Sequence, residues 1–533
     1  MARIEVGGER GVVRWEGEVG DTGHWLGVEW DRQGRGRHGG SHRGQQYFTP
    51  SRPGQDTCSF VRRAKVTQWG GGLLEAVRRR YGVVEGDTAG VEEAGMAELQ
   101  VEIGARFVQV VGFDKVNRQQ SDIRHLRTAS VRNLGVSGPG DCGAGLAAEL
   151  PALRDLDLSE SLVSDWAEVG EIACQLGLQE LDLSYNLLPV SSLPGGLVME
   201  TVRHLVLGHM LYSGYTWQEI LSLAAHLPSL AVLQVHNNDI SRLALPGGQL
   251  FAQLTELDLD GNSLTDWVEV NSLAGLPGLQ HLRLNGNRLV GIAVEAGGFP
   301  SLESLQLSGN CVSDWTSVGT LDLLPRLVQL RLRANPVCSQ CKDEETARQL
   351  IIARIGRLAS LNGTAVSAAE RKWAEIDYLK QYGPGWLEAG RATDPAAAKL
   401  LFLAAHNRYD RVVAQHGEPD PGDGVATDTR LVASLVRVKV RAPQLLATPD
   451  TVKKLPASMT VRALRALLQR LYRAQAGEAR VRVSLLPSSA TRPDQEVALD
   501  NDMRDIGFFS VGEGDSLLVR WGEDAGMPIV TDL

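Results

Sequence analysis

Cysteine is scarce in this chain of 533 residues. Six cysteines are present, at irregular intervals: Cys58, Cys142, Cys174, Cys311, Cys338 and Cys341. So sparse a set excludes the disulfide framework of small secreted domains. The spacing of Cys338 and Cys341 occurs in zinc and redox sites, but no second Cys or His pair stands nearby at ligand spacing. We therefore expect two loop cysteines after the last repeat and no metal site.

Long apolar runs and nucleotide-binding motifs are also missing. No uninterrupted stretch of ~18 apolar residues could span a bilayer, and the first ten residues contain no apolar core of a signal peptide. No P-loop or Gly-x-Gly-x-x-Gly motif follows a strand-like segment, and the eleven histidines are scattered. We expect a cytoplasmic protein that does not contact membranes. We expect no enzymatic activity, no catalytic residues and no cofactor.

The bulk composition is that of a globular protein. A hydrophobic content of 43% and a charged content of 22% are ordinary values, and the length predicts about three or four domains. The formal net charge is -10. This acidity speaks against nucleic acid as the main partner of the whole chain.

The N-terminal region is rich in glycine, aromatic residues and positive charge. Residues 7–66 contain thirteen glycines, and residues 32–65 contain eight Arg and Lys side chains against one acid, Asp56. Glycines permit tight turns, and aromatics supply a surface for a ligand. The pattern predicts a small barrel of short strands. Its basic groove could hold an acidic peptide or a nucleic-acid backbone, or the barrel could be purely structural.

Five motifs in this region resemble the CAP-Gly family: Gly11-x-Val-Arg-Trp15, Gly23-x-Trp25-x-Gly27-Val-Glu29, Gly36-Arg-His-Gly-Gly40, Tyr47-Phe48 and Ser59-Phe60-Val61-Arg62. The resemblance implies a small all-β barrel over residues 1–70 that binds acidic C-terminal tails ending in an aromatic residue, above all that of α-tubulin. The tail-binding residues that it implies are Trp25, Gly36, Arg37, His38, Gly39, Gly40, Phe60 and Arg62.

The glycine loop departs from the usual Gly-Lys-Asn-Asp-Gly of that family. Arg37 keeps the positive charge, and its planar guanidinium can hold a carboxylate through two hydrogen bonds. His38 lacks the amide of Asn, and Gly39 lacks the Asp carboxylate. The affinity for a tail is therefore an open question at this stage.

Residues 119–340 repeat the template Leu-x-x-Leu-x-Leu-x-x-Asn-x-Leu. Its ninth positions recur every 23 to 28 residues, at Ser161, Asn186, Met210, Asn238, Asn262, Asn287, Asn310 and Asn335. This period is typical of leucine-rich repeats, an α/β solenoid. We expect each Leu-x-Leu to form a short strand and each Asn side chain to bond backbone groups of the turn. Asp-Trp pairs at Asp165, Asp266 and Asp314 share one repeat phase, which favours a packing role.

The template directs its third, fifth and seventh side chains outward on the concave face. These positions carry acids early in the array and arginines late: Asp155, Asp157, Glu180, Asp182, Asp258, Asp260, Arg283, Arg331 and Arg333. Such a gradient could orient a large protein partner, or the charges could simply keep a strand surface soluble.

The remaining segments connect and cap these parts. Residues 71–118 are expected to be a connector, with a helix over 73–81 and a strand over 101–111. Residues 341–395 are expected to cap the solenoid, because its end must be covered. Residues 396–430 are predicted to hold one helix near 396–415 and a Pro- and Gly-rich linker.

The C-terminal segment, residues 431–523, shows strand, helix, strand and final strand periodicity. It resembles the ubiquitin-like β-grasp, an α+β fold. The chain ends without Gly-Gly, so we expect docking rather than conjugation.

The order of the three domains resembles the tubulin-folding cofactor E family, as do segments such as Ala347 to Gly356 and Ala374 to Lys380. The resemblance implies a multidomain, cytoskeleton-associated chaperone that captures α-tubulin and meets β-tubulin carried by cofactor D. With cofactor C it would promote assembly of the α/β-tubulin dimer, and with cofactor B it would help to dissociate it. A microtubule-associated CAP-Gly adaptor that recruits partners through its repeats is the alternative.

Overall fold

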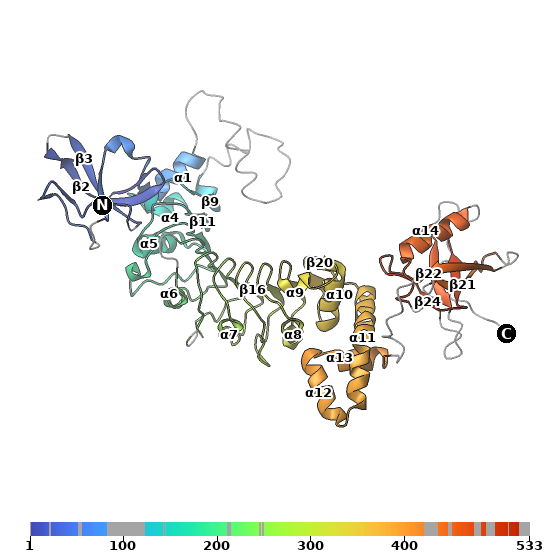
Figure 1. Ribbon diagram of the computed structural model, residues 1–533. Coiled ribbons are helices and arrows are strands. Elements are labelled where there is room, and N and C mark those ends of the chain that lie inside the picture. The colour runs from blue at the N-terminus through green and yellow to red at the C-terminus, as the bar shows by residue number, and fades with distance from the viewer. Residues whose placement is uncertain are drawn as a thin grey trace. The chain divides into compact units, whose positions relative to one another are not determined.

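The computed structural model divides into two compact units, each described here by itself (Figure 1). The first comprises Met1–Glu375 and Thr393–His416, and the second comprises Ile376–Ala392 and Gly417–Leu533. The structure describes residues 2–20, 23–32, 34–51, 56–82, 123–141, 143, 145–210, 215–244, 247, 250–419, 435–445, 450–473, 481–486, 496–509 and 511–521. No helix among them is long and apolar enough to cross a bilayer.

The first unit begins with a five-stranded antiparallel sheet in the order β6-β3-β2-β1-β7. Its strands are β1 Arg3–Val6, β2 Glu9–Glu18, β3 His24–Trp30, β6 Cys58–Val61 and β7 Gln68–Trp69. A hairpin of β4 Ser41–His42 and β5 Gln45–Gln46 stands beside it, and a 3-10 turn η2 covers Arg63–Lys65. The core is formed by Ile4, Leu26, Val28, Trp30 and Val61. The all-β prediction is confirmed, and we call this part the N-terminal module.

The repeats form an eleven-stranded sheet whose strands follow chain order. All neighbours are parallel except the last pair. The strands are β9 Thr128–Ser130, β11 Asp155–Asp157, β12 Glu180–Asp182, β13 His204–Val206, β14 Val232–Gln234, β15 Glu256–Asp258, β16 His281–Arg283, β17 Ser304–Gln306, β18 Gln329–Arg331, β19 Ser360–Leu361 and β20 Thr364–Ala365. Each strand from β11 to β18 buries one central leucine, as the repeat template predicts.

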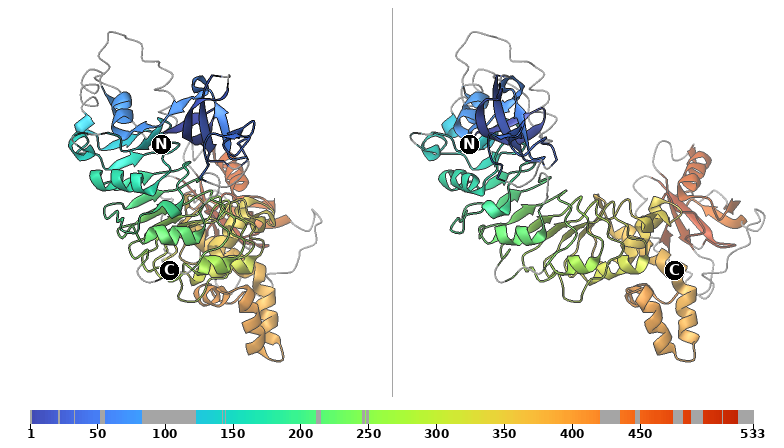
Figure 2. Two further views of the ribbon diagram at one scale, coloured as in Figure 1. Left: turned by 90° about the vertical axis from the view of Figure 1, so that its left-hand side faces the viewer. Right: turned by 60° about the vertical axis from the view of Figure 1, so that its left-hand side comes forward.

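Short helices lie along the outer side of this array (Figure 2). They are α4 Leu146–Glu149, α5 Trp166–Leu176, α6 Trp217–Ala224, α7 Trp267–Asn271 and α8 Trp315–Thr320, with 3-10 turns η3 Ile123–His125, η4 Val190–Ser192 and η5 Leu321–Leu323. Asp165, Asp266 and Asp314 cap α5, α7 and α8 by accepting backbone N–H bonds, and the tryptophan after each starts the helix. The structural role predicted for the Asp-Trp pairs is confirmed.

The repeated asparagines form a buried ladder. Asn262 donates through Nδ2 to the carbonyls of Val235 and Leu259, at 3.0 Å each, and accepts through Oδ1 from Asn238 N and Ile240 N. Asn186, Asn238, Asn287, Asn310 and Asn335 donate to carbonyls in the same way. The predicted bonding to turn backbone is thus confirmed.

The described start of the connector pairs with the first repeats. The predicted helix forms as α1 Leu73–Tyr81, and β8 Gly71–Gly72 pairs in parallel with β10 Val136–Gly138. The predicted strand over 101–111 lies outside the described residues.

The end of the solenoid is covered by α9 Pro336–Ser339, α10 Glu344–Arg354, the first part of α11 Ala368–Arg391, α12 Pro395–Ala405 and α13 Tyr409–His416. The prediction of one helix near 396–415 is wrong, because the chain turns between α12 and α13. Asn407 in this turn donates to the carbonyl of Gly319 at 2.7 Å, and Arg408 donates to that of Ala353 at 2.8 Å. These bonds fasten α13 to the last repeats, so this segment belongs to the cap.

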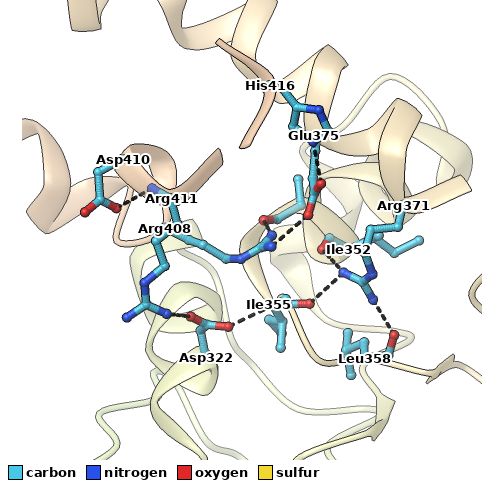
Figure 3. A network of polar contacts seen from close by, with 12 residues as sticks. Asp322, Ile352, Ile355, Leu358, Arg371, Glu375, Arg408, Asp410, Arg411 and His416 are labelled. Carbon is cyan, nitrogen blue, oxygen red and sulfur yellow. Dashed lines mark hydrogen bonds and ion pairs between the residues drawn. The ribbon is translucent and has the colours of Figure 1, made fainter. Parts of the chain in front are cut away.

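A buried charge network holds this cap together (Figure 3). Glu375, with no exposed surface, accepts from Arg408 and His416 at 2.7 Å each. Asp322 accepts from Gly356 N at 2.9 Å and pairs with Arg411 at 3.3 Å. Sequence periodicity gave no sign of this network, because its members are spread over nearly 100 residues.

The second unit contains a five-stranded sheet in the order β22-β21-β25-β23-β24, crossed by one helix. Its elements are β21 Leu435–Arg441, β22 Thr451–Pro456, α14 Val461–Leu471, β23 Arg482–Leu486, β24 Val497–Ala498 and β25 Ser516–Arg520. The predicted β-grasp is confirmed, with β22 and β24 added to the strands that the sequence indicated. The middle of α11 contacts this domain through Asp377, which pairs with Arg504 at 3.1 Å, and Lys380, which donates to the carbonyl of Phe508 at 2.6 Å.

Candidate functional site: a basic, aromatic groove

The N-terminal module contains a groove of about 640 Å³. Its lining residues are Val6, Val19, Trp25, Trp30, Arg35, Arg37, His38, His42, Ser59, Phe60, Val61, Arg62 and Lys65. Strands β3 and β6 supply the tryptophans and Phe60, and the glycine loop between β3 and β4 supplies Arg37 and His38. Strands β3 and β6 and the loop that follows β3 therefore meet around one cavity.

Phe60 is the centre of an aromatic cluster. Its ring lies 4.6 Å from the ring of His38 and 5.4 Å from that of Tyr47. Trp15 and Phe48 contact it edge-on, at 5.8 and 5.9 Å. Because such edge-to-face pairs favour one geometry, the half-buried Phe60 is held in place before any ligand arrives.

Two positions of the loop require glycine because the neighbouring backbone lies too close for a side chain. A Cβ at Gly36 would stand 2.3 Å from the backbone nitrogen of Cys58. Gly40 has a φ of +88°, and a Cβ there would stand 2.1 Å from the carbonyl oxygen of Phe48. The loop is therefore pressed against β6, where Arg37 N donates to the carbonyl of Cys58 at 2.7 Å. This contact fixes the direction of the loop beside the groove.

His38 is held by the same loop. Its Nδ1 accepts a hydrogen bond from Gly40 N at 3.1 Å, which favours the neutral tautomer with a proton on Nε2. Burial, and then the nearby His42, lower the pKa of His38 below its usual range. His38 therefore presents a neutral imidazole to the groove at neutral pH.

Cations surround the aromatic wall. The guanidinium of Arg62 lies 3.9 Å from the ring centre of Trp25 and donates to the carbonyl of His24, and Arg35 lies 4.8 Å above Trp30. Arg37 and Lys65 also line the groove, and its described lining contains no carboxylate. Cations beside an aromatic surface are suited to an acidic peptide that carries an aromatic side chain.

Five of the eight groove residues expected from the sequence line this cavity, and the other three belong to the loop beside it. Trp25, Arg37, His38, Phe60 and Arg62 line it, while Gly36, Gly39 and Gly40 shape the loop. Sequence reasoning missed Arg35, His42 and Lys65 as lining residues, and the supporting aromatics Trp15, Tyr47 and Phe48. The motifs contained most of these residues, but only the fold shows which side chains turn toward the cavity.

Some charges of the basic region point elsewhere. Arg32 pairs with Glu9 and Arg63 with Glu16, each at 3.1 Å. Arg52 lies outside the described residues. The charge available to a ligand is therefore smaller than the sequence count.

Seven of the nine predicted concave residues lie on strands of the repeat sheet, and Asp260 and Arg333 follow the ends of β15 and β18 by two residues. Asp155 stands beside Glu180, and Asp157 beside Asp182, on the neighbouring strands β11 and β12. Burial raises the pKa of Asp182, and the neighbouring Asp157 raises it further, against hydrogen bonds from Ser184 that lower it. These four carboxylates form an acidic patch at the start of the array.

The charge gradient along the face is weaker than the sequence suggested. Arg283 pairs with Glu256 at 3.2 Å and with Asp258 at 3.3 Å, and Asp258 is only 5% exposed. Asp260 accepts hydrogen bonds from Asn285. The charge of Arg283 is thus neutralised internally, and the exposed arginines of the predicted set are Arg331 and Arg333 at the end.

Of the two cysteines after the last repeat, Cys341 lies in a loop as expected and Cys338 does not. Cys338 lies within the short helix α9, and Cys341 follows it. Both are free thiols whose pKa is raised, first by burial. No group of His, Cys, Asp and Glu in the described residues is placed to hold a metal ion.

Comparisons with known proteins agree with this domain order. The CAP-Gly domain family matches residues 1–66, and the leucine rich repeat family matches residues 277–337. Tubulin-specific chaperone E of Bos taurus is 38% identical over 97% of this chain and 98% of its own, and that of Homo sapiens is 36% identical over the same shares. The solution structure of the C-terminal ubiquitin-like domain of mouse tubulin-specific chaperone e is 32% identical, with a TM-score of 0.15, over 19% of this chain and 95% of that one.

Proposed function

This chain belongs to the tubulin-specific chaperone E family, and we propose that it binds α-tubulin and promotes assembly and dissociation of the α/β-tubulin heterodimer. Its role is that of a tubulin-folding cofactor. The finer partners that we propose are cofactor D, which brings β-tubulin, cofactor C in assembly and cofactor B in dissociation. We place this activity in the cytoplasm, in association with the cytoskeleton.

The groove is the observation that supports capture of the α-tubulin tail. An acidic tail that ends in an aromatic residue matches a cavity with Phe60 and Trp25 on its wall and Arg37 and Arg62 beside them. The terminal ring would lie against the aromatic wall. The carboxylates would pair with the arginines.

The repeats supply a second contact in this proposal. The N-terminal module is bonded to the first repeats by Arg3, which donates to the carbonyl of Leu162 at 3.1 Å, and by Arg10, which donates to that of Tyr185 at 2.7 Å. A tail held in the groove therefore stays close to the strand face. Such tethering raises the effective concentration of the tubulin body there, so two modest contacts give a firm hold.

No catalytic step is part of this proposal. The chain acts by binding, and we propose that it is not an enzyme. Charges on the strand face, such as Asp155 and Arg331, would set the orientation of tubulin more than the strength of its binding.

A pull-down with purified α/β-tubulin tests the proposal. The full chain and a Phe60→Ala variant are each incubated with intact tubulin, detyrosinated tubulin and tubulin whose tails have been removed. We expect intact tubulin to bind best, and we expect Phe60→Ala to reduce its binding to the level of tail-less tubulin.

Two results would count against the proposal. Failure to bind soluble tubulin, alone and with the other cofactors, would remove the chaperone role. Cosedimentation with microtubules without any depolymerisation would support the adaptor instead.

A further inference from the structure

The sheet of the C-terminal domain has one covered and one charged face. Along β21, Val438 and Val440 are buried while Leu435, Arg437, Lys439 and Arg441 are exposed. Helix α14 buries Val461, Leu464 and Leu468, and it covers the side that carries the valines. The opposite face is turned to solvent along β21 and β22, whereas Ser516, Leu518 and Arg520 of β25 are buried.

Strand pairing brings cations of two strands together on this open face. Arg437 of β21 stands opposite Lys454 of β22. We name as the basic sheet face the exposed cations of these two strands, which are Arg437, Lys439, Arg441 and Lys454.

Two carboxylates partly balance this charge. Glu513 lies 3.5 Å from Arg437, and Asp450 lies 2.7 Å from Arg441. Within the described residues, Lys439 and Lys454 have no ion pair. Among the described residues, these four cations and two carboxylates leave a surplus of two positive charges, in a chain whose net charge is -10. The basic sheet face is therefore a positively charged patch on a protein of negative net charge.

Protection of the sheet edge explains only part of this pattern. Strand β22 is at the edge of the sheet, and lysines on an edge strand prevent pairing with other chains. Arg437 and Lys439, however, lie on β21, which is paired on both sides. The charges of Arg437 and Lys439 therefore do not protect an edge strand, and edge protection does not explain them.

The contact with α11 uses another part of the domain. Arg504 and Phe508, in the loop before β25, contact Asp377 and Lys380. The side chains of Lys439 and Lys454 remain exposed. The contact between the C-terminal domain and α11 thus leaves the charged face exposed.

We propose that the basic sheet face binds an acidic segment of a partner protein. Its surplus positive charge attracts carboxylates, and the exposed Val452, which stands opposite Lys439, offers apolar contact within the same patch. An extended chain with alternating acidic and apolar side chains matches both features. This site is separate from the groove of the N-terminal module and does not need a terminal aromatic residue.

Charge reversal in the full chain tests this site. The probe is a fluorescent decamer of glutamate with an amidated C-terminus, which offers the groove neither an aromatic ring nor a terminal carboxylate. Binding is followed by anisotropy at low salt. The double variant Lys439→Glu/Lys454→Glu is compared with Arg470→Glu/Arg473→Glu, which makes the same change of net charge on and just after α14.

We expect the sheet-face variant to weaken binding about tenfold and the α14 variant about twofold or less, because contacts at the patch add to the general attraction. Arg62→Glu, in the groove, changes the net charge by half as much as either double variant and should weaken binding of this probe no more than the α14 variant does, which separates the present site from tail capture. Equal weakening by both double variants would overturn the proposal, and so would absence of binding by the unaltered chain. Tighter binding of single-stranded DNA or of anionic vesicles, lost in the sheet-face variant, would assign the face to another class of ligand.

Discussion

Arg3 and Asp31 form a buried ion pair with two hydrogen bonds of 2.6 Å at the base of the N-terminal module. The Nε of the same arginine donates to the carbonyl of Leu162 in the first repeats. One side chain therefore joins the interior of the module to the solenoid. This link gives the groove a fixed position relative to the strand face, which the proposed two-point capture of tubulin requires.

Replacement of Arg3 by methionine should destabilise the module strongly. Asp31, only 4% exposed, would lose its cation, and breaking a buried pair in this way costs about 3–5 kcal/mol. The free energy of unfolding is measured by urea titration with tryptophan fluorescence. The double variant Arg3→Met/Asp31→Asn removes both charges and should recover part of the loss. An unchanged midpoint in the single variant would show that the pair contributes nothing.

The asparagine ladder should be equally sensitive. Asn262→Ala removes two buried donors to carbonyls and the acceptor of two backbone N–H groups, which should cost about 2–4 kcal/mol. Asn271→Ala, which removes one bond to the carbonyl of Ala293, should cost about 1 kcal/mol. Thermal unfolding of the two variants gives the comparison. Similar losses would mean that the ladder is worth no more than a surface hydrogen bond.

Periodic features of this protein were predictable from its sequence. The leucines and Asn262, Asn287 and Asn310 recur at one spacing because each repeat buries the same side chains against the next. The aromatic and glycine motifs likewise located the groove. Local patterns of this kind determine local structure directly.

Contacts between distant segments were not predictable in the same way. The charge of Arg283 looked available on the concave face, but its neighbours Glu256 and Asp258 come from the preceding repeat and neutralise it. The helix expected near 396–415 is divided because Asn407 bonds to Gly319. Such pairs depend on tertiary packing, which no period in the sequence records.

Glu375 should be essential to the cap of the solenoid. Glu375→Leu would leave Arg408, 11% exposed, and His416 facing an apolar side chain, at a cost of about 3–5 kcal/mol. Glu375→Gln keeps one acceptor and should cost less. Limited proteolysis followed by mass spectrometry is expected to show faster cleavage in α12 and α13 of the leucine variant. Unaltered cleavage there would mean that other contacts hold α13 in place.

The same cap should lose stability in mild acid through His406. Burial and the neighbouring Arg354 lower the pKa of His406 from 6.5 to about 4. The unfolded chain therefore takes up a proton at a higher pH than the folded chain. The stabilisation is complete above pH 6.5 and is lost as the pH falls toward 4. Because the ring is only half-buried, we expect a loss of about 1 kcal/mol.

Urea titrations at pH 7.5 and at pH 5 would measure this effect. His406→Gln has no proton to gain, so its stability should change less between the two pH values than that of the unaltered chain. The same change in both proteins would assign the acid sensitivity to other groups.

Two adjacent arginines offer a sharp test of the groove. Arg62 lines the cavity above Trp25, whereas Arg63 pairs with Glu16 and contacts Trp69. Reversal of either charge changes the net charge of the module equally. For an acidic peptide that ends in tyrosine, we expect Arg62→Glu to weaken binding about tenfold or more, and Arg63→Glu less than threefold.

The salt dependence of binding by these two variants distinguishes a specific contact in the groove from general electrostatic attraction. Isothermal titration at increasing ionic strength should reduce the small effect of Arg63→Glu toward zero, because exposed charges are screened within about 10 Å at 0.1 M salt. The effect of Arg62→Glu should persist in part, since its guanidinium also stacks on Trp25. If the two variants lose affinity equally at every salt concentration, the peptide responds to the charge of the whole module and is not held in the groove.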